Sequence, residues 1–571
     1  MRFPVWPVVP FFHARGIEGM RCRPIACWTF KILTLVWLCQ VFIPLPAFSQ
    51  DAATGSAVGV LEMSLGEAIS LALRSNRSIQ IAYLDRVLQK YDLKVAEDKF
   101  WPDVTFSGSV GRTDARDETT QALDRTESDS VRDEYSGTVS VVETIPTGGV
   151  FQFLWAPAGN EYDADDFSSG AGLTRQNSDT YASSWGVSFT QPLLKGGGID
   201  VNTASVAQAR LAEKSNVLSL KSTLISTVSS VIAAYRAYLQ ARDQVEIGRA
   251  SLERARKLVE INKLLIASGR MASVELVQSE AEVASREFAL EGVLNNFDRA
   301  RLALIKVLDI PKATRFVLTE EGALHRIVPD PDVCTATAFE NRPDYLQALL
   351  NLENTKINLQ LAENNRLWDL SFNATYGEAD SRADRTIDGL VSPRLRSEND
   401  QWSVGLSLQV PVWGDLSREQ SALAAKTGLR KANISLKELQ DNIEAEVLDA
   451  VRDVMARLKQ VDLATLSREL SEQKLMIEEA KLKAGRSTNF QLVSFQNDLV
   501  NAQNAELNAI TDYRNALTSL DLVLGTTLDT WKIEFRSDRT VGGGARPGID
   551  ENPSLRSRPQ KHIIQNPDGR S

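Results

Sequence analysis

The stretch GVSFTQPLLKGGGID at residues 186–200 decides how this chain folds. Its first part alternates large apolar Val187 and Phe189 with small polar side chains, and a proline and three glycines follow. Alternation of this kind predicts a β-strand, and the segment after the glycines predicts a long helix. The same pattern returns at 405–416, GLSLQVPVWGDL. The chain therefore twice builds a strand that ends at a proline and continues as a helix.

Other landmarks are duplicated in the same order. Residues 103–111, DVTFSGSVG, match 369–377, DLSFNATYG. Further along, SGRMASVELVQSEAEV at 268–283 matches AGRSTNFQLVSFQNDL at 484–499. Self-similarity in a constant order indicates an internal duplication.

Each repeat predicts very long helices. From about Thr203 to Ala267 there is no proline, and apolar residues recur every seven positions from Leu224 to Ile266. A sustained heptad marks helices that pack lengthwise, and about 65 residues make a rod of roughly 100 Å. Such rods must run side by side in an elongated assembly. A coiled-coil structural protein would also fit these helices.

The predicted strands argue against a simple coiled coil. Residues 402–410, 370–376 and 104–110 alternate apolar with small polar side chains. Such runs suit tilted strands that cross a bilayer around a wet lumen, although a half-buried strand of a soluble sheet fits the pattern equally well. About four strands per chain cannot close a wide barrel. Several chains must share one barrel, because lipid forbids an open sheet edge.

The strand-to-helix junctions then acquire a meaning. Pro192 and Pro411 end sheet pairing where each strand leaves the membrane. Gly196 and Gly414 let the backbone swing into the following helix. We therefore expect two strand-to-helix junctions per chain at one face of the membrane.

An apolar run near the N-terminus predicts export. ILTLVWLCQVFIPL at 32–45 follows basic residues and precedes a small-x-small site, so we expect a signal peptide cleaved before Gln50. Met20 can serve as the start, because residues 1–19 add nothing that a signal needs. A retained anchor fits less well because the run is short for a span. Bulky residues before Cys39 make a poor lipidation site.

Charge and composition narrow the partners. Of 64 basic and 74 acidic side chains, five and one lie in residues 1–49, so the remainder carries a net charge of −14. This balance argues against a nucleic-acid partner. Outside residues 1–49, Cys334 is alone and His325 and His562 are far apart, so we expect no internal disulfide and no zinc site.

Together these features resemble the TolC-like outer-membrane efflux protein family of Gram-negative bacteria. The resemblance covers about 64–528 and rests on LGEAISLALRSN, ENRPDYLQAL, QPLLKGGGID, VPVWGDLSREQ and the two Gly-Arg helix breaks. It implies a mixed α+β membrane protein: a trimeric outer-membrane β-barrel with about four strands per protomer, continuous with a long periplasmic α-helical barrel. The implied partners are a homotrimer, a periplasmic adaptor (membrane fusion) protein, an inner-membrane pump of RND or ABC type, and outer-membrane lipid.

The resemblance also assigns residues to the periplasmic tip. A glycine followed by a new periodic run suits a helix-to-helix turn, and in the family this break contacts the adaptor. Acidic rings near the tip select cations in such proteins, although a solvated charged face is the alternative for each acid. The implied adaptor contacts are Ser268, Gly269, Arg270, Ala484, Gly485 and Arg486, and the gate candidates are Glu275, Glu478 and Glu479.

The first repeat departs from this pattern. From Phe106 to Pro192 it spends 86 positions, against 39 from Phe372 to Pro411. The excess contains GTVSVVETIPTGGVFQFLW at 137–155, a hairpin signal. This hairpin is either an extracellular flap or two additional barrel strands per protomer, which would make eighteen in a trimer.

The polar, acidic stretches that flank the hairpin, 112–134 and 156–180, have the composition of exposed loops. The Gly/Pro-rich C-terminal segment predicts a disordered periplasmic tail. The expected organisation is a signal peptide at 1–49, a linker at 50–63, a first repeat at 64–310, a connecting segment at 311–334, a second repeat at 335–528 and a tail at 529–571.

The favoured function is the outer-membrane exit duct of a tripartite efflux or type I secretion system. The main alternative is a secreted coiled-coil structural or interaction protein without a pore. We expect no enzyme: there is no nucleophile elbow, HExxH or phosphate loop, so no catalytic residue, cofactor or metal is assigned. Drugs, metal ions, siderophores and polypeptides all remain open as cargo.

Overall fold

A computed structural model describes residues 61–121, 124–169, 172–312, 314, 316–319, 322–411, 416–484 and 486–533. The predicted signal peptide with Met20, Cys39 and Gln50, and all but the first residues of the predicted tail, lie outside the described residues. The described residues all belong to one compact unit, so the two repeats are copies within it rather than separate domains.

Each repeat contains a short helix, a helix of 22 residues, strands, a very long helix and a returning helix. The long helices, α5 and α9, have 64 and 68 residues, which corresponds to rods of about 96 and 102 Å. The helices are α2 (Leu65–Ser75), α3 (Arg77–Asp98), α4 (Ile199–Asn202), α5 (Ala204–Ala267), α6 (Val274–Leu308), α7 (Pro331–Asn341), α8 (Pro343–Asn364), α9 (Leu416–Lys483), α10 (Asn489–Leu524) and α11 (Thr527–Thr530).

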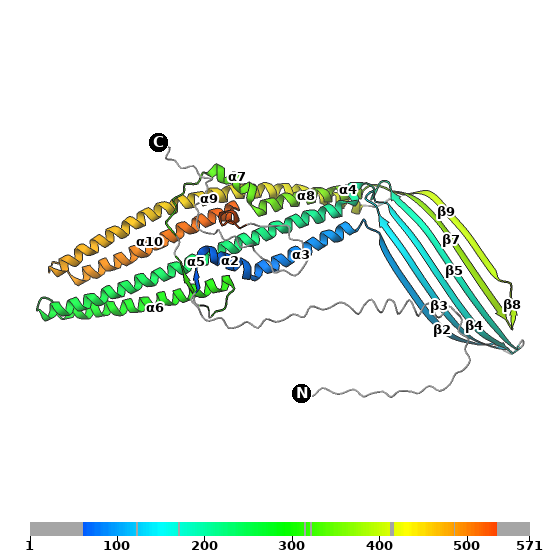
Figure 1. Cartoon of the computed structure of the whole chain (residues 1–571). Coiled ribbons are helices and arrows are strands. Elements are labelled where there is room, and N and C mark those ends of the chain that lie inside the picture. The colour runs from blue at the N-terminus through cyan, green and yellow to red at the C-terminus, as the bar shows by residue number, and fades with distance from the viewer. Residues whose placement is uncertain are drawn as a thin grey trace, which may run out of the picture. The chain divides into compact units, whose positions relative to one another are not determined.

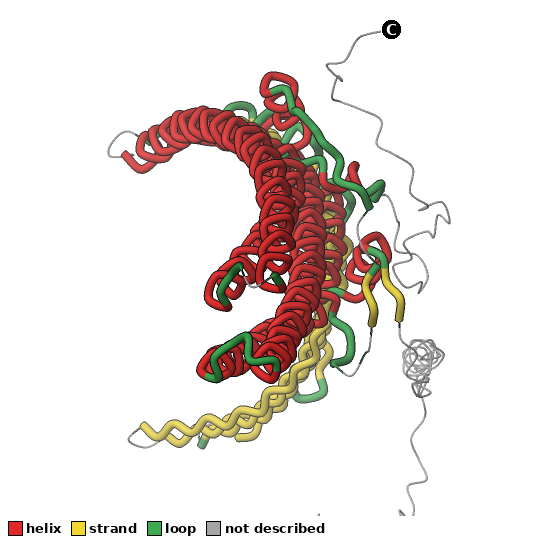
Figure 2. The backbone as a smooth tube through the Cα atoms, turned by 90° about the vertical axis from the view of Figure 1, so that its left-hand side faces the viewer, coloured by secondary structure: helices red, strands yellow, loops and turns green. Residues whose placement is uncertain are grey.

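The long helices form one curved layer, as the heptads predicted (Figures 1 and 2). Helix α5 packs against α3 and α6 on one side and against α8 and α10 on the other. Helix α9 packs against α8 and α10. The layer therefore runs from α3 and α6 at one edge, through α5 and then α8 and α10, to α9 at the other edge.

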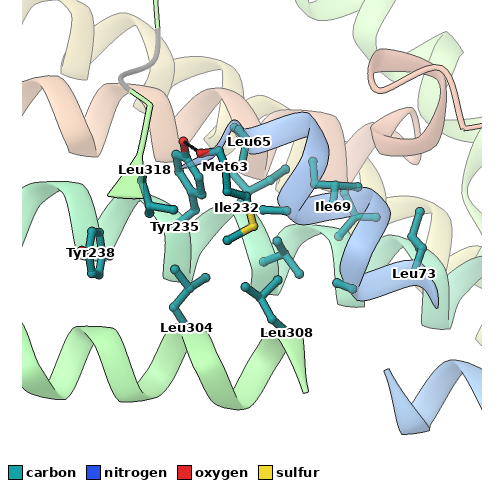
Figure 3. Close-up of a cluster of buried hydrophobic side chains, with 14 of the residues drawn as sticks. Met63, Leu65, Ile69, Leu73, Ile232, Tyr235, Tyr238, Leu304, Leu308 and Leu318 are labelled. Atoms are coloured by element: carbon teal, nitrogen blue, oxygen red, sulfur yellow. Dashed lines mark hydrogen bonds between the residues drawn. The ribbon is translucent and has the colours of Figure 1, made fainter. Parts of the chain in front are cut away.

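Short elements cover the middle of α5 and build the largest core (Figure 3). Strand β1 (Leu61–Met63) pairs in parallel with β6 (Phe316–Leu318), and α2 packs beside them. Helix α2 begins at a capping box formed by Ser64 and Glu67. The Tyr235 hydroxyl lies 3.1 Å from the Met63 carbonyl oxygen and joins this cover to α5. By length and composition α5 contains a stretch apolar enough to span a bilayer, but its apolar side chains form this core.

The remaining strands form one antiparallel sheet with six long strands in the order β2-β3-β4-β5-β7-β9, and the two-residue β8 pairs with the end of β7. Their bounds are β2 (Asp103–Gln121), β3 (Asp124–Thr144), β4 (Val150–Ser168), β5 (Gly172–Pro192), β7 (Asp369–Ile387), β8 (Leu390–Val391) and β9 (Leu395–Gln409). Figure 1 shows no helix over either face of this sheet.

The expectation of about four strands per protomer is corrected to six. The hairpin signal at 137–155 corresponds to β3 and β4, which pair with β2 and β5 along nearly their whole length. The second repeat lacks this hairpin, so matching the repeats gave four strands; of the two alternatives left open for the hairpin, the sheet has the two additional strands per protomer. The mixed α+β fold class itself is confirmed.

The polar stretches expected to be loops are also strands. Cross-strand ion pairs hold them in the sheet: Arg116 lies 3.4 Å from Asp129, and Arg175 lies 2.7 Å from Asp165. Opposite charges on facing strands stabilise pairing although each strand alone is polar. The composition of one segment could not reveal this, because the partner charge belongs to another segment.

Asp521, a half-buried acid on α10, generates a pH prediction. Burial raises the pKa of Asp521 to about 6, although Thr526 and Thr530 donate hydrogen bonds that oppose the shift. The unfolded carboxyl titrates near 3.9, so the folded state binds the proton more tightly. Stability from this group is present below about pH 4 and is lost as the pH rises towards 6.

We expect Asp521→Asn to raise the free energy of unfolding by about 2–3 kcal/mol at pH 7 and to have little effect at pH 4. Thermal unfolding of the detergent-purified protein at both pH values measures this. Asp529→Asn, an exposed acid on α11, is the control. An equal effect of Asp521→Asn at both pH values would contradict the assignment.

Candidate functional site

One face of the sheet carries large apolar side chains, and the other carries mostly small polar side chains. Cross-strand pairing places side chains of like kind in continuous rows across all six long strands. Aromatic rings meet along the apolar face, with Trp185 and Tyr376 centroids 5.5 Å apart. One apolar row is Val104, Val141, Phe153, Val187, Tyr376 and Trp402; the next row, on the opposite face, is Thr105, Ser140, Leu154, Gly186, Gly377 and Gln401.

The apolar band runs obliquely across the strands. On β2 it extends from Val104 to Val110, and on β9 from Trp402 to Leu408. Because Val104 and Trp402 belong to one row, the band moves about six residues along the strands between the two edges. Six residues at ~3.3 Å each shift the band by about 20 Å along the strands, while five strand spacings of ~4.8 Å cover about 24 Å across them. These lengths correspond to strands tilted by about 40° from the axis of a barrel, which is within the range of transmembrane barrels. The apolar face thus has the geometry of a lipid-facing wall.

The first strand-to-helix junction is built on the α8–β7 turn. Strand β5 ends at Pro192, and the Leu193 N–H still donates to the Leu370 carbonyl at 2.7 Å. Gly196, with φ of 78°, donates its N–H to the Asn364 side-chain oxygen at 2.7 Å. The left-handed angle brings this N–H to α8 at little cost, because glycine has no Cβ.

The turn between β3 and β4 completes the same junction. The Gly198 N–H and the Gln191 side-chain amide each donate to the Thr147 carbonyl at 3.1 Å. Gly148 has φ of 94°, and a Cβ there would lie 2.5 Å from the Gly196 carbonyl oxygen. Sequence reasoning missed this contact, although the Gly-Gly of the turn was visible.

The second junction is only partly described. Pro411 lies two residues beyond the end of β9 and is exposed, and α9 begins at Leu416. Gly414 lies outside the described residues.

The first helix break forms a turn at the far end of α5. Helix α5 ends at Ala267 with Ser268 as its C-cap, and Gly269 has φ of 68°. The Gly269 N–H donates to the Ile266 carbonyl and the Arg270 N–H to the Leu265 carbonyl, both at 2.9 Å. A left-handed glycine with such bonds is a usual helix C-terminus. Arg270 leads into α6 beyond this turn.

The second break joins α9 to α10 in a similar way. The Ala484 N–H donates to the Ala480 carbonyl at 3.2 Å, and the Arg486 N–H donates to the Lys481 carbonyl at 2.9 Å. Gly485 lies outside the described residues. The Thr488 side chain caps α10.

Glu478 holds this second turn together. Its side chain is only 4% exposed and accepts hydrogen bonds from the Ser487 hydroxyl at 2.6 Å and the Lys481 ammonium at 3.1 Å. The Ser487 hydrogen bond, helped by Lys481, lowers the pKa of the Glu478 carboxyl. The roles expected for Glu478 are an acid of the gate or part of a solvated charged face. Its carboxylate is buried and paired within the turn, so both expectations are corrected.

The other two candidate acids occupy different surroundings. Glu275, at the start of α6, accepts a hydrogen bond of 3.0 Å from the amide of Asn489, which is buried at the start of α10. This bond joins the tips of the two helical hairpins. Glu479 is half-buried, and its charge acts on Arg254, whose pKa is lowered chiefly by burial.

Both edges of the chain are apolar and unpaired. Exposed side chains on α3 and α6 recur at heptad spacing, and α9 carries a matching set at the opposite edge. Strands β2 and β9 each pair with only one long strand in the described chain. The edge side chains are Ile81, Leu84, Leu88, Tyr91, Val95, Val274, Val277 and Phe288 on one side and Leu448, Met455, Leu463, Leu470 and Ile477 on the other.

Within the described ranges, no group of three or more His, Cys, Asp or Glu side chains is arranged to hold a metal ion. The described cysteine, Cys334, is buried.

The tip turn yields a prediction. Glu478→Gln removes the charge that binds Lys481, so we expect amide exchange at 484–488 to rise at neutral pH. In the unchanged protein the same loosening should occur only as the pH falls through the folded-state pKa, which lies below the usual value of about 4.3. Hydrogen exchange measured by mass spectrometry tests this, with Glu479→Gln as the control. Unchanged exchange in Glu478→Gln would show that its carboxylate does not hold the turn.

Known proteins share these features. Residues 68–309 match the family model described as outer membrane efflux protein. Nodulation protein T of Rhizobium leguminosarum bv. trifolii is 21% identical over 360 residues, which cover 62% of this chain and 74% of that protein. The alkaline protease secretion protein AprF of Pseudomonas aeruginosa is 22% identical over 397 residues, 64% of this chain and 73% of that protein.

Solved structures agree in fold. The outer-membrane channel OprN superposes with a TM-score of 0.57 at 15% identity, covering 81% of this chain and 89% of that one. The CmeC outer membrane channel of Campylobacter jejuni gives a TM-score of 0.55 at 15% identity, with coverage of 85% and 93%. Residues 68–309 thus match the outer membrane efflux protein family, whose TolC-like members are Gram-negative outer-membrane channels with a periplasmic helical part, and the amphipathic tilted sheet and layer of long helices have the fold of these channels.

Proposed function

We propose that this protein is the outer-membrane exit channel of a tripartite efflux or type I secretion system. It conducts cargo from the periplasm or the pump to the exterior and performs no chemistry of its own. The observation that supports this is a sheet with an apolar outer face, a polar inner face and two unpaired edges, continuous with a curved layer of helices. A wall of this kind encloses a path only when it is closed by further copies.

The proposed closed form is a homotrimer. Strand β2 of one copy pairs with β9 of the next, and the apolar stripe on α3 and α6 meets the stripe on α9. The two edges of one chain differ, so the contact is heterologous and must close into a ring. We propose three copies because that is the number that the resemblance to the TolC-like family implies.

The proposed partners bind at the helix tips. We assign the adaptor contact to Ser268, Gly269, Arg270, Ala484, Gly485 and Arg486, because the described residues of this set are exposed and lie where one helix ends before the next begins. Glu275 and Glu479 are retained as candidates for the gate, whereas Glu478 supports the turn. The energy for transport comes from an inner-membrane pump of RND or ABC type.

The alternative, a secreted coiled-coil spacer, leaves the sheet unexplained. A soluble sheet would cover its apolar face, but Phe106 is 76% exposed and Trp402 is 73% exposed. Large contiguous apolar surfaces are rare on soluble proteins. Lipid is the simplest cover for them.

Oligomerisation tests the channel. The detergent-extracted protein should run as a heat-modifiable oligomer and conduct ions in planar bilayers. Leu88→Glu places a charge in the α3 stripe, so we expect the oligomer band to dissociate at a lower temperature. Gln89→Glu adds the same charge beside the stripe and should leave the band unchanged. A parent protein that is monomeric and soluble without detergent would refute the proposal.

Photo-crosslinking tests the tip. A photoreactive amino acid in place of Arg270, in cells that carry the native system, should capture a periplasmic membrane fusion protein. The same substitution at Arg249, about five helical turns before the end of α5, should not. Capture at Arg249 alone would place the adaptor contact elsewhere.

A further inference from the structure

We propose that the β3–β4 hairpin is part of the channel wall and that three chains close an eighteen-stranded barrel, whose lumen is wide and lacks charged side chains in the membrane band, so that it admits cargo too bulky for a twelve-stranded barrel. This inference rests on the proposed channel function. It adds that the upper size of the cargo is set by an insertion present in one repeat and lacking in the other.

The position of the hairpin turn carries the argument. An extracellular flap would have its turn at the end of the sheet away from the helices. Instead, the turn at 145–149 lies at the helix end, where Thr147 accepts hydrogen bonds from Gly198 and Gln191. To reach this point, β3 and β4 must pass through the whole apolar band.

The hairpin also continues both faces of the sheet. Val141 and Phe153 lie in the apolar row of Val104 and Val187. On the same face, the Trp155 indole N–H donates to the Ser183 hydroxyl of β5 at 3.1 Å.

Gly159 on β4 allows aromatic side chains to meet on the apolar face further from the helix end of the sheet. Tyr135 on β3 and Tyr181 on β5 have ring centroids 6.3 Å apart across β4. Their contact is possible because Gly159 stands between them, where a Cβ would overlap the Tyr135 ring. Alternation of this kind along both added strands is what a lipid-facing wall requires.

The width of the sheet supports inclusion of the hairpin. Six strands spaced ~4.8 Å apart and tilted by about 40° span roughly 38 Å of circumference, whereas four span roughly 25 Å. The helical layer is four positions wide, and at up to ~10 Å per position it spans roughly 40 Å. With six strands, sheet and helices have nearly equal widths, so the conduit continues without a constriction at the junction.

The diameter follows from the strand number. At the same spacing and tilt, eighteen strands give a backbone diameter of roughly 36 Å and twelve give roughly 24 Å. The inner face carries no charge in the membrane band, and apart from Gln152 and Leu154 on β4 its side chains there are mostly small. Its side chains there on β2, β3 and β5 are Thr105, Ser107, Ser109, Ser136, Thr138, Ser140, Ser184, Gly186 and Ser188. A lumen of this kind selects by size rather than by charge.

Cysteine labelling tests whether the hairpin is wall. In proteoliposomes, Ser140→Cys should face water and Val141→Cys should face lipid. We expect a membrane-impermeant maleimide to label the first about ten-fold or more faster, because lipid burial suppresses the thiolate. The unsubstituted chain controls for background, since burial raises the pKa of the Cys334 thiol.

Labelling of strand β5 distinguishes failure of the eighteen-stranded barrel from failure of the proposed channel function. This strand belongs to the wall with or without the hairpin, so Ser188→Cys and Val187→Cys should show the same contrast. If the two β5 variants differ in labelling rate but Ser140→Cys and Val141→Cys are labelled equally fast, only the eighteen-stranded barrel is overturned. Equal labelling on both strands would overturn the channel itself.

Polymer exclusion tests the size of the lumen. Replacing residues 122–171 with Asn-Gly joins β2 to β5 and leaves four long strands per chain. We expect the largest neutral polymer that enters from the extracellular side to fall in radius by about a third. An unchanged exclusion radius in a conducting trimer would overturn the proposal. If the deletion fails to fold, the labelling contrast still decides.

Discussion

The structure depends on one constraint: backbone N–H and C=O groups inside lipid must be hydrogen-bonded. One copy satisfies this along β3, β4, β5 and β7, but the outer edges of β2 and β9 have no partner within the described chain. An unsatisfied group in hydrocarbon costs several kcal/mol, so open edges of this length cannot persist in a membrane. The edges of the helical layer repeat the same incompleteness with apolar stripes. The sheet and the helical layer therefore both need a further copy of the chain at each edge.

The junctions connect two kinds of wall with different repeat distances. Sheet strands lie about half as far apart as packed helices, so a wall of constant width needs more strands than helices. The chain meets this need by tilting the strands and by inserting a hairpin whose turn lies in the junction. Gly148, Gly196 and Gly198 all have positive φ there, and the polar contacts of Asn364 and Asn202 fix the path. The junction is thus a packed unit of three segments rather than a flexible link.

A few polar contacts at the helix tips fix the ends of the long helices relative to one another. Glu478 closes the α9–α10 turn from within, and the Glu275–Asn489 hydrogen bond joins this hairpin to α6. A small apolar cluster of Leu258, Leu475 and Leu482 with their neighbours packs α5 against the same hairpin. Because these contacts lie inside one protomer, they order the turns at the helix tips without any contribution from another chain.

Local periodicity in the sequence determined the long helices, the alternating strands, the duplication and the strand-to-helix order, because heptads and two-residue alternation depend on neighbours in the chain. Tertiary structure alone decided that β3 and β4 join the wall, since their polar ends are stabilised by partners such as Arg116 with Asp129 on another strand. It likewise decided that Glu478 is buried, because its charge is compensated only once the chain turns back to bring Ser487 beside it. Contacts between distant segments carry no periodic signal, and burial of a charge cannot be inferred until its partner is in place.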